Sequence, residues 1–224
     1  MPKFIYRMTF TLTVLLIPTV GLAQQGKDYV RQAIDTRAEV YRDVALQIWD
    51  FAELGYLEKK SSELLQEQLR QAGFQVQSGV ADIPTAFVAS YGRGEPVIGI
   101  LAEFDALPGL SQEAVPSRQA RLDQASGHAC GHHLFGTAST AAAIALKDWL
   151  SQSRTAGTIR LYGTPAEEGG SGKVYMVRAG LFDDVDVVLN WHPGSENSAS
   201  PYTTNANRSA KFRFQGISSH AAGA

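Results

Sequence analysis

The sequence predicts an α/β fold, a three-layer αβα sandwich whose mostly parallel sheet is covered by helices on both faces. Three apolar segments carry this prediction, at residues 97–101, 158–162 and 185–189, because each has the length and continuous hydrophobicity of a buried strand. Helical sequence separates them, an alanine-rich stretch at residues 137–150 and a shorter one at 171–179. Strands that alternate with helices indicate parallel strands joined by crossovers.

The remaining elements follow from spacing and from residues that stop helices. Apolar residues at helical intervals, with no Gly or Pro, predict one long helix from Asp28 to Phe51. A second helix is expected to begin at Ser61 or Ser62 and to end at Gly73. Near the end of the chain, the alternation at residues 211–214 is typical of a half-exposed strand.

The N-terminal residues have the features of a secretory signal peptide. Lys3 and Arg7 precede an apolar run from Met8 to Val20, and small residues follow it up to Ala23. The run is too short, and too interrupted by Pro18, to span a membrane comfortably. We therefore expect residues 1–23 to be removed and the protein to be exported, to the periplasm or the medium, with no stable membrane insertion afterwards.

Charge and composition narrow the class of partner. The chain has 224 residues, of which 44% are hydrophobic, so it can form a real core. Residues 1–23 hold two of the 20 basic side chains and none of the 22 acidic ones, which leaves the mature part acidic. No basic stripe is present, so the sequence argues against nucleic acid and favours a small molecule as the partner.

Polar side chains follow each of the three predicted strands. Glu103 and Asp105 come after the first, Glu167 and Glu168 after the second, and His192 after the third. Ligands of open α/β sheets bind at the carboxyl ends of the strands, so these side chains are expected to share one site. Adjacent glutamates can divide the work there, one binding a metal ion while the other accepts a proton from water. In isolation, a pair of glutamates is often only a solvated turn.

The densest cluster of reactive side chains lies at residues 127–133. Cys130, the single cysteine, and His132 are ligand types that suit zinc and related ions, and Gly131 permits the sharp turn that would aim them at one point. Three of the five histidines fall in this segment. The alternatives are a buried cysteine beside surface histidines, a hydrolase with Cys130 as its nucleophile, and a metal-binding module without catalysis.

Five motifs in this order resemble the amidohydrolase branch of the M20 metallopeptidases. Each motif is weak alone, but the ordered set is specific. The resemblance extends from the first helix of the mature chain to the end. The motifs are Leu-Ala-Glu-Phe-Asp-Ala-Leu-Pro-Gly-Leu at 101–110, Gly-His-Ala-Cys-Gly-His at 127–132, Thr-Pro-Ala-Glu-Glu-Gly-Gly at 164–170, Asn-Trp-His-Pro at 190–193 and Gly-Ile-Ser-Ser-His-Ala-Ala-Gly at 216–223.

The resemblance implies two divalent metal ions, Zn²⁺ or Mn²⁺, and a ligand set. Cys130 would lie between the two ions and His132 would bind one of them. Glu168 and His192 would be further ligands. The family often has Asp or Asn where this chain has His133, so the role of that position is open, and His133 itself is a competing ligand.

The resemblance also implies catalytic roles and a partner. Glu167 would act as the general base, and Asp105 would orient a metal ligand. His220 would reach into the neighbouring subunit of a homodimer and stabilise the developing oxyanion. The expected reaction is the hydrolysis of an amide bond in a small N-acyl amino acid, either p-aminobenzoyl-glutamate-like or another N-acyl or N-aryl amino acid or dipeptide.

The same resemblance divides the chain into a signal peptide at residues 1–23, a metal-dependent catalytic domain at 24–205 and the start of a small α+β lid and dimerisation domain at 206–224. The family's last metal ligand is a histidine that would lie beyond residue 224. The catalytic domain and the lid are therefore expected to be incomplete here, and residues 1–224 alone are expected to have little hydrolase activity.

Overall fold

The structure is a computed structural model that describes residues 19–199, 203–220 and 222. The chain divides into two units, residues 1–193 and 194–224. The predicted signal peptide lies for the most part outside the described residues. None of the described helices combines the length and apolarity needed to cross a membrane.

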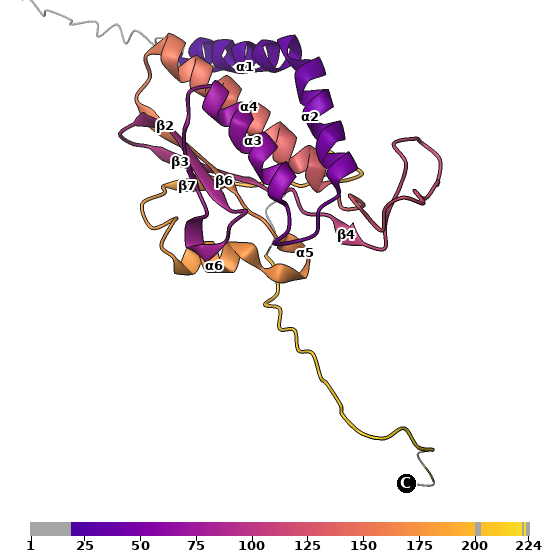
Figure 1. Ribbon diagram of the computed structural model, residues 1–224. Helices are drawn as coiled ribbons and strands as arrows, with labels where there is room; N and C mark the ends of the chain where they lie inside the picture. The colour runs from indigo at the N-terminus through magenta and orange to yellow at the C-terminus, as the bar shows by residue number, and fades with distance from the viewer. Residues whose placement is uncertain (1–18, 200–202, 221, 223–224) are drawn as a thin grey trace, which may run out of the picture. The chain divides into compact units, whose positions relative to one another are not determined.

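The first unit alternates helices with strands, in the order shown in Figure 1. Its helices are α1 (Thr19–Thr36), α2 (Ala38–Phe51), α3 (Lys59–Gln71), the 3₁₀ turn η1 (Val80–Asp82), α4 (His132–Ser153), the short irregular turn α5 (Glu167–Gly170) and α6 (Gly172–Arg178). Its strands are β1 (Gln75–Ser78), β2 (Phe87–Arg93), β3 (Val97–Ala102), β4 (Leu107–Pro108), β5 (Ser126–Gly127), β6 (Gly157–Gly163) and β7 (Val187–Leu189).

The central sheet has the strand order β1-β2-β6-β3-β7. Strands β6, β3 and β7 pair in parallel, and β2 is antiparallel to both of its neighbours, so β2 alone runs against the other four. The three predicted apolar segments are thus β3, β6 and β7, side by side. Their carboxyl ends meet at one edge of the sheet, which is where the polar motifs follow.

Helices cover both faces of this sheet. One face packs against α2, α3 and α4 through a core that includes Ile48, Leu65 and Phe104, all buried. The opposite face packs through Tyr162 and Met176 against η1 and α6. Figure 1 shows the same layering, with α3 and α4 over the sheet and α6 beyond it. The predicted three-layer α/β arrangement is confirmed.

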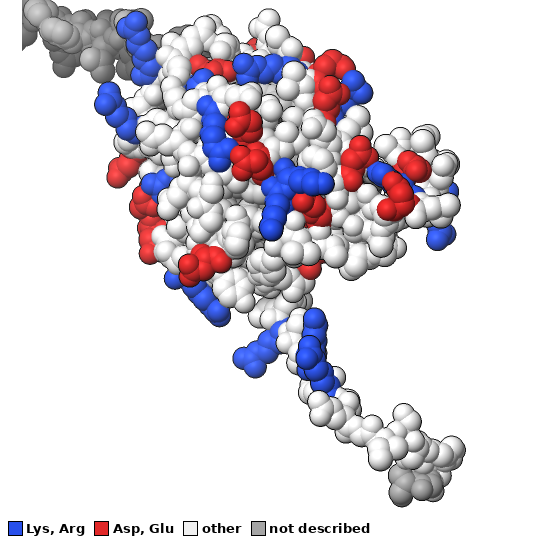
Figure 2. All heavy atoms as spheres, in the orientation of Figure 1, with Lys and Arg blue, Asp and Glu red and all other residues white. Residues whose placement is uncertain are grey.

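The surface of the first helices is mixed in charge. On the face shown in Figure 2, acidic and basic side chains are interspersed. Several form ion pairs, such as Arg42 with Glu39 at 2.8 Å and Arg70 with Glu63 at 2.8 Å. Exposed pairs of this kind contribute little to stability, on the order of 0–1 kcal/mol.

The structure corrects the prediction of a single helix from Asp28 to Phe51. The chain turns at Arg37, between α1 and α2. The hydroxyl of Thr36 donates to the carbonyl of Gln32 at 2.8 Å, which satisfies a backbone acceptor at the end of α1. The sequence has no Gly or Pro here, so hydrophobic periodicity alone does not reveal the end of α1.

Two other boundaries differ from the prediction. Helix α3 begins at Lys59 rather than at a serine, because Glu53 accepts the backbone N–H groups of Lys60 and Ser61 at 3.1 and 2.9 Å. Residues 211–214, in the second unit, are not a strand in the described chain, and Phe212 and Phe214 are exposed. A strand requires a paired neighbour, and no described strand pairs with these residues.

The end of β6 is packed so closely that it tolerates only glycine. A Cβ atom added to Gly163 would lie 2.1–2.5 Å from the ring of Phe87, which stacks on Phe104. We predict that Gly163→Ala lowers the free energy of unfolding by about 1–3 kcal/mol, measured by urea denaturation. Adding Phe87→Leu should recover part of that loss, because the shorter side chain makes room for the methyl group. If the double variant loses as much unfolding free energy as the two single variants together, the predicted clash is contradicted.

Candidate metal centre

The carboxyl ends of β3, β6 and β7 bring the predicted site residues to one edge of the sheet. Glu103 and Asp105 follow β3, Glu167 and Glu168 lie in α5 just after β6, and His192 follows β7. Cys130 and His132 approach the same edge from the turn between β5 and α4. The parallel pairing of the three strands therefore assembles the site from four separate segments of the chain.

His132 is held by Asp105 in one orientation. The imidazole is fully buried, and its Nδ1 donates to Oδ1 of Asp105 at 2.9 Å. Because a carboxylate in that position accepts, Nδ1 carries a proton, and Nε2 points the other way, toward Glu103. The second oxygen of Asp105 accepts the backbone N–H of Glu168 at 2.8 Å. One carboxylate thus orients a candidate ligand from α4 and the backbone of another from α5.

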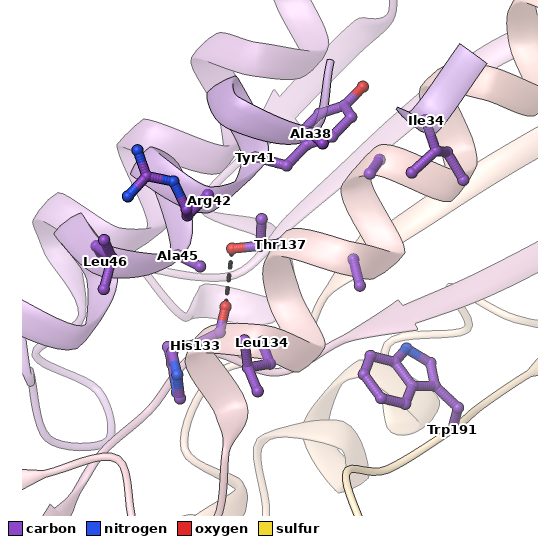
Figure 3. A pocket seen from close by; sticks show the side chains of 12 residues that line it. Ile34, Ala38, Tyr41, Arg42, Ala45, Leu46, His133, Leu134, Thr137 and Trp191 are labelled. Carbon is purple, nitrogen blue, oxygen red and sulfur yellow. Dashed lines mark hydrogen bonds between the residues drawn. The ribbon is translucent and has the colours of Figure 1, made fainter. Parts of the chain in front are cut away.

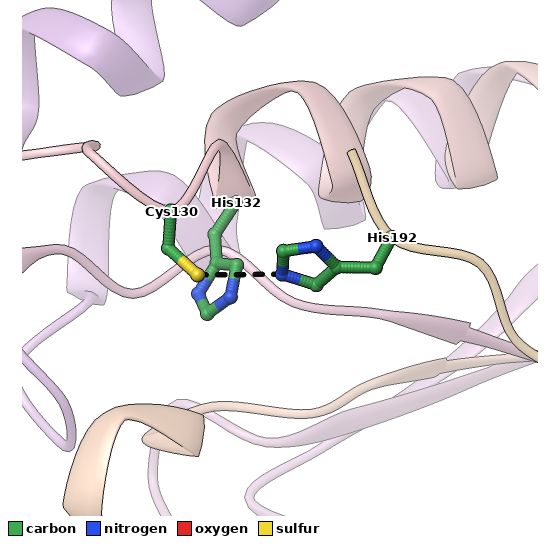
Figure 4. Close-up of side chains that lie close together, drawn as sticks. All are labelled: Cys130, His132 and His192. Atoms are coloured by element: carbon green, nitrogen blue, oxygen red, sulfur yellow. Dashed lines mark hydrogen bonds between the residues drawn. The ribbon is translucent and has the colours of Figure 1, made fainter. Parts of the chain in front are cut away.

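Cys130 and His192 face each other across the site (Figure 4). The Cys130 Sγ atom lies 3.3 Å from Nε2 of His192. For Zn–S and Zn–N bonds of about 2.3 and 2.0 Å in a tetrahedral site, two such ligands would lie about 3.5 Å apart. The Nδ1 of His192 contacts the carbonyl of Pro193 at 2.8 Å, and a carbonyl can only accept, so Nε2 carries the free lone pair toward the sulfur.

Local structure fixes this pair of side chains. Gly131 has a φ of +81° and precedes α4, and a Cβ added to it would lie 3.0 Å from the ring of Pro193. Glycine is therefore required both by the backbone and by the approach of the β7 exit. On the other side, the indole N–H of Trp191 donates to Ser139 of α4 at 3.0 Å, which anchors the residue before His192.

Three ligand-type atoms in the centre are buried and make no hydrogen bond. They are Nε2 of His132, Oε2 of Glu103 and Oε1 of Glu168. Nε2 lies 2.9 Å from the Glu103 oxygen, the distance of an ion pair when the imidazole is protonated, and 4.0 Å from the Glu168 oxygen. Buried polar atoms are nearly always satisfied in proteins, so orphaned atoms that converge on a point indicate a missing partner. A divalent cation fits this donor set.

The electrostatics of the centre also favour a cation. Burial lowers the pKa of His132, but the carboxylates of Asp105 and Glu103 outweigh burial and raise it to about 10. Burial, followed by the charge of Glu103, raises the pKa of Glu167 above its usual range. The carboxylates therefore create a negative potential that a positive charge would relieve.

Two groups of side chains have the spacing of metal ligands. Cys130, His132 and His192 form one, and Glu103, His132 and Glu167 form the other, with ligand atoms within 4.8 Å of one another in each group. His132 belongs to both. Glu168 as the ligand and Glu167 as the base stays a prediction. An oxygen of Glu168 lies 4.0 Å from Nε2 of His132, but it is Glu167 that has the spacing of a metal ligand with Glu103 and His132.

The protonation of Cys130 bears on the alternative in which it is the nucleophile. Burial and the neighbouring carboxylates, Glu168 foremost, raise the pKa of this thiol to about 12. A thiol nucleophile needs a lowered pKa, so that the thiolate is populated at neutral pH. Among these carboxylates, a thiolate requires a compensating cation. The surroundings therefore favour Cys130 as a metal ligand over Cys130 as a nucleophile.

The other two histidines of the cluster belong to neither group of ligands. His128 is buried and donates from Nε2 to the carbonyl of Ile48 at 3.0 Å, and burial lowers its pKa to about 4. His133 packs edge-on against Trp49, with ring centroids 4.8 Å apart, and burial lowers its pKa to about 3. Neutral imidazoles packed on aromatic rings are structural in character.

His133 instead lines an apolar groove between α2 and α4. Figure 3 shows it beside Leu134 and Thr137, across from Tyr41 and Leu46. The groove has a volume of about 550 Å³. This placement, together with the contact with Trp49, argues against His133 as a competing metal ligand.

Sequence reasoning missed two residues that shape the centre, Lys173 and Glu58, and left the role of a third, Glu103, open. From the sequence, Glu103 is expected at the shared edge of the sheet, although an ordinary turn explains it nearly as well; in the structure it is buried and lies against His132. Lys173 of α6 forms an ion pair with the other oxygen of Glu103. Glu58 is buried and accepts the backbone N–H of Ala166, just before the two glutamates. Lys173 and Glu58 belong to polar stretches of the sequence that carry no signal of burial.

His220 lies in the second unit, residues 194–224, where its Nδ1 accepts the backbone N–H of Ala222 at 3.2 Å. Its predicted role in a neighbouring subunit stays a prediction, as does the assignment of residues 206–224 to a lid.

The chain matches a known protein family. Residues 99–214 match the peptidase family M20/M25/M40, a segment that contains every predicted site residue except His220. The chain belongs to this family. As an M20-family protein, it places its candidate metal centre where the three parallel strands end.

Relatives extend the match beyond that segment. The chain is 49% identical to one of the subunits of the p-aminobenzoyl-glutamate hydrolase of Escherichia coli, over 87% of its own length and 40% of that protein. It is 32% identical to Xaa-Arg dipeptidase of the mouse over 85% of its length and 43% of that protein. The chain thus spans about two fifths of the length of these curated relatives.

A solved structure shares the fold. A dinuclear metal-binding peptidase of the M20 family from Bacillus subtilis superposes with a TM-score of 0.55 at 25% identity, over 75% of this chain and 44% of that one.

The geometry predicts which histidine matters for metal binding. His132→Ala and Cys130→Ser should each reduce bound zinc or manganese, measured by elemental analysis after dialysis, because each removes a convergent ligand. His133→Phe is the matched control, since phenylalanine preserves the contact with Trp49. We expect this variant to retain the wild-type metal content. Loss of metal from His133→Phe, with retention in His132→Ala, would contradict the assignment.

Proposed function

We propose that this protein is a metal-dependent hydrolase that cleaves the amide bond of a small N-acyl amino acid. Membership of the M20 family supports the class of reaction. The names of the two relatives, a p-aminobenzoyl-glutamate hydrolase and a dipeptidase, both describe hydrolysis of an amide bond next to an amino acid. A p-aminobenzoyl-glutamate-like substrate is therefore the first to test.

One observation carries the proposal more than any other. Buried ligand atoms of His132, Glu103 and Glu168 converge without hydrogen bonds, beside the facing pair of Cys130 and His192. A divalent cation placed among these atoms would satisfy them together. The donor set of thiolate, imidazole and carboxylate suits zinc, and carboxylate-rich sites also suit manganese.

The residues divide the proposed reaction among them. Divalent ions held by Cys130, His132, Glu168 and His192 would make a bound water more acidic and polarise the scissile carbonyl. Glu167 would accept a proton from the attacking water and donate it to the departing amine, a role typically worth about 10²–10⁴-fold in rate. Asp105 accepts a hydrogen bond from Nδ1 of His132, which turns Nε2 toward the position where a metal ion would bind.

The remaining parts of the proposal concern the assembled protein. Two divalent ions per subunit are proposed, with Cys130 between them, and the relative from Bacillus subtilis is a dinuclear metal-binding peptidase. We propose a homodimer in which His220 of one subunit would donate a hydrogen bond to the oxyanion formed in the other. We also propose export to the periplasm or the medium, on the basis of the signal-like residues 1–23.

Substitution of the two glutamates separates their roles. In the full-length protein, Glu167→Gln should retain bound metal and lose at least about 100-fold in kcat, because an amide cannot accept the proton. Glu168→Gln should lose metal as well as activity. Metal content and hydrolysis of p-aminobenzoyl-glutamate, measured side by side, check both. If Glu167→Gln loses metal and Glu168→Gln keeps it, the two roles are reversed. Activity that survives a chelator would overturn the metal-dependent reaction.

A further inference from the structure

Glu58 is a buried carboxylate that the proposed reaction does not use. It lies just before α3, its side chain is fully buried, and burial raises its pKa. Among the described residues, no Lys, Arg or His side chain forms an ion pair with it. Burying an unpaired carboxylate is costly, so its presence calls for a specific role.

Both oxygens of Glu58 accept hydrogen bonds. Oε2 accepts from the hydroxyl of Thr85 at 3.0 Å, and Oε1 accepts from the backbone N–H of Ala166 at 2.8 Å. The contact with Ala166 joins residues that are 108 positions apart in the sequence. Glu58 therefore connects the start of α3 to the turn that presents Glu167 and Glu168.

That turn has an unusual backbone at the point of contact. Ala166 has a φ of 56° and a ψ of 44°, the left-handed conformation that a non-glycine residue rarely adopts. Holding an alanine there costs on the order of 1 kcal/mol, so surrounding contacts have to stabilise it. Glu168 also departs from helical geometry, with a ψ of 77°. The direction of both glutamates thus depends on a strained turn.

The loop before Glu58 packs against the same turn. A Cβ added to Gly55 would lie 3.0 Å from the Cα and Cβ atoms of Ala166. The hydroxyl of Tyr56 donates to the carbonyl of Gly170, at the far end of the turn, at 2.6 Å. Residues 55–58 therefore contact both ends of α5, and Asp105 holds its middle through Glu168.

We propose that Glu58 is a positioning residue, which holds Ala166 in the left-handed conformation and so sets where the carboxylates of Glu167 and Glu168 point. The proposal rests on the function proposed above, because it assigns to Glu58 the alignment of the general base and of one metal ligand. What the turn requires is a hydrogen-bond acceptor for the N–H of Ala166; the negative charge of Glu58 is incidental.

This distinction sets the choice of variants. Glu58→Gln keeps an oxygen that can accept from Ala166 and places its amide group beside the hydroxyl of Thr85, which can accept from it. Glu58→Leu has a similar volume but no acceptor. Replacing a buried charge by an apolar side chain of similar volume is often tolerated by the fold. Thr85→Val is the matched control, because it removes the other hydrogen bond of Glu58 and leaves the one to Ala166.

The test uses the full-length protein, with kcat and KM for p-aminobenzoyl-glutamate and with the visible absorption of bound Co²⁺ as a second measurement that does not depend on turnover. We expect Glu58→Leu to lower kcat by roughly 100-fold, because a catalytic group displaced by about 1 Å loses about that much rate, with little change in KM. Its Co²⁺ spectrum should shift, because Glu168 moves relative to the other ligands. Glu58→Gln and Thr85→Val should resemble the wild type in both measurements.

The outcomes are distinguishable. If the wild type neither binds Co²⁺ nor hydrolyses amides, the proposed function fails and the role of Glu58 fails with it. If the wild type does both, and folded Glu58→Leu matches it in kcat and spectrum, only the positioning role is overturned. Should Glu58→Leu not fold, replacing the peptide N–H of Ala166 by an ester oxygen removes the same hydrogen bond. Wild-type kcat and spectrum in that protein would equally overturn the proposal.

Discussion

The candidate centre depends on the carboxylate of Asp105 more than on any other single group. This side chain is buried, and it accepts from His132 with one oxygen and from the backbone of Glu168 with the other. It therefore links the start of α4 to the turn after β6, two segments that meet only because their strands lie side by side. Charge-assisted hydrogen bonds of this kind are short and strong, which is what a precise arrangement of ligands requires.

Around that link, the site is a region of concentrated negative charge. Glu103, Glu167 and Glu168 surround Nε2 of His132, while Lys173 pairs with only one oxygen of Glu103. The protein stabilises this arrangement through the surrounding fold rather than within the cluster, by the packing of the three strands and by contacts such as that of Glu58 with Ala166. A bound cation would neutralise the remaining negative charge, and the groups that surround it would take part in the proposed hydrolysis.

Much of this architecture could be predicted from the sequence, for identifiable reasons. Continuous apolar runs revealed β3, β6 and β7, and the rule that parallel strands share a carboxyl edge brought Asp105, Glu168 and His192 together. The glycine between Cys130 and His132 was informative because few other residue types adopt its backbone conformation, with a φ of +81°. These signals are local, so a single sequence can show them.

What the sequence did not reveal depends on tertiary contacts. No Gly or Pro marks the break at Arg37, and the start of α3 is set by Glu53, a residue type that also occurs within ordinary helices. The importance of Glu58 arises from an N–H group far along the chain, and that of Lys173 from its ion pair with Glu103, 70 positions away in the sequence. No local pattern distinguishes these residues from their exposed neighbours.

The central claim is that Cys130 and the histidines bind a metal ion together, and X-ray absorption spectroscopy of the zinc-loaded full-length protein tests it most directly. The account predicts a sulfur scatterer at about 2.3 Å from zinc together with nitrogen or oxygen scatterers at about 2.0 Å, and predicts that Cys130→Ser removes the sulfur contribution. Zinc coordinated by nitrogen and oxygen alone in the wild-type protein would contradict it.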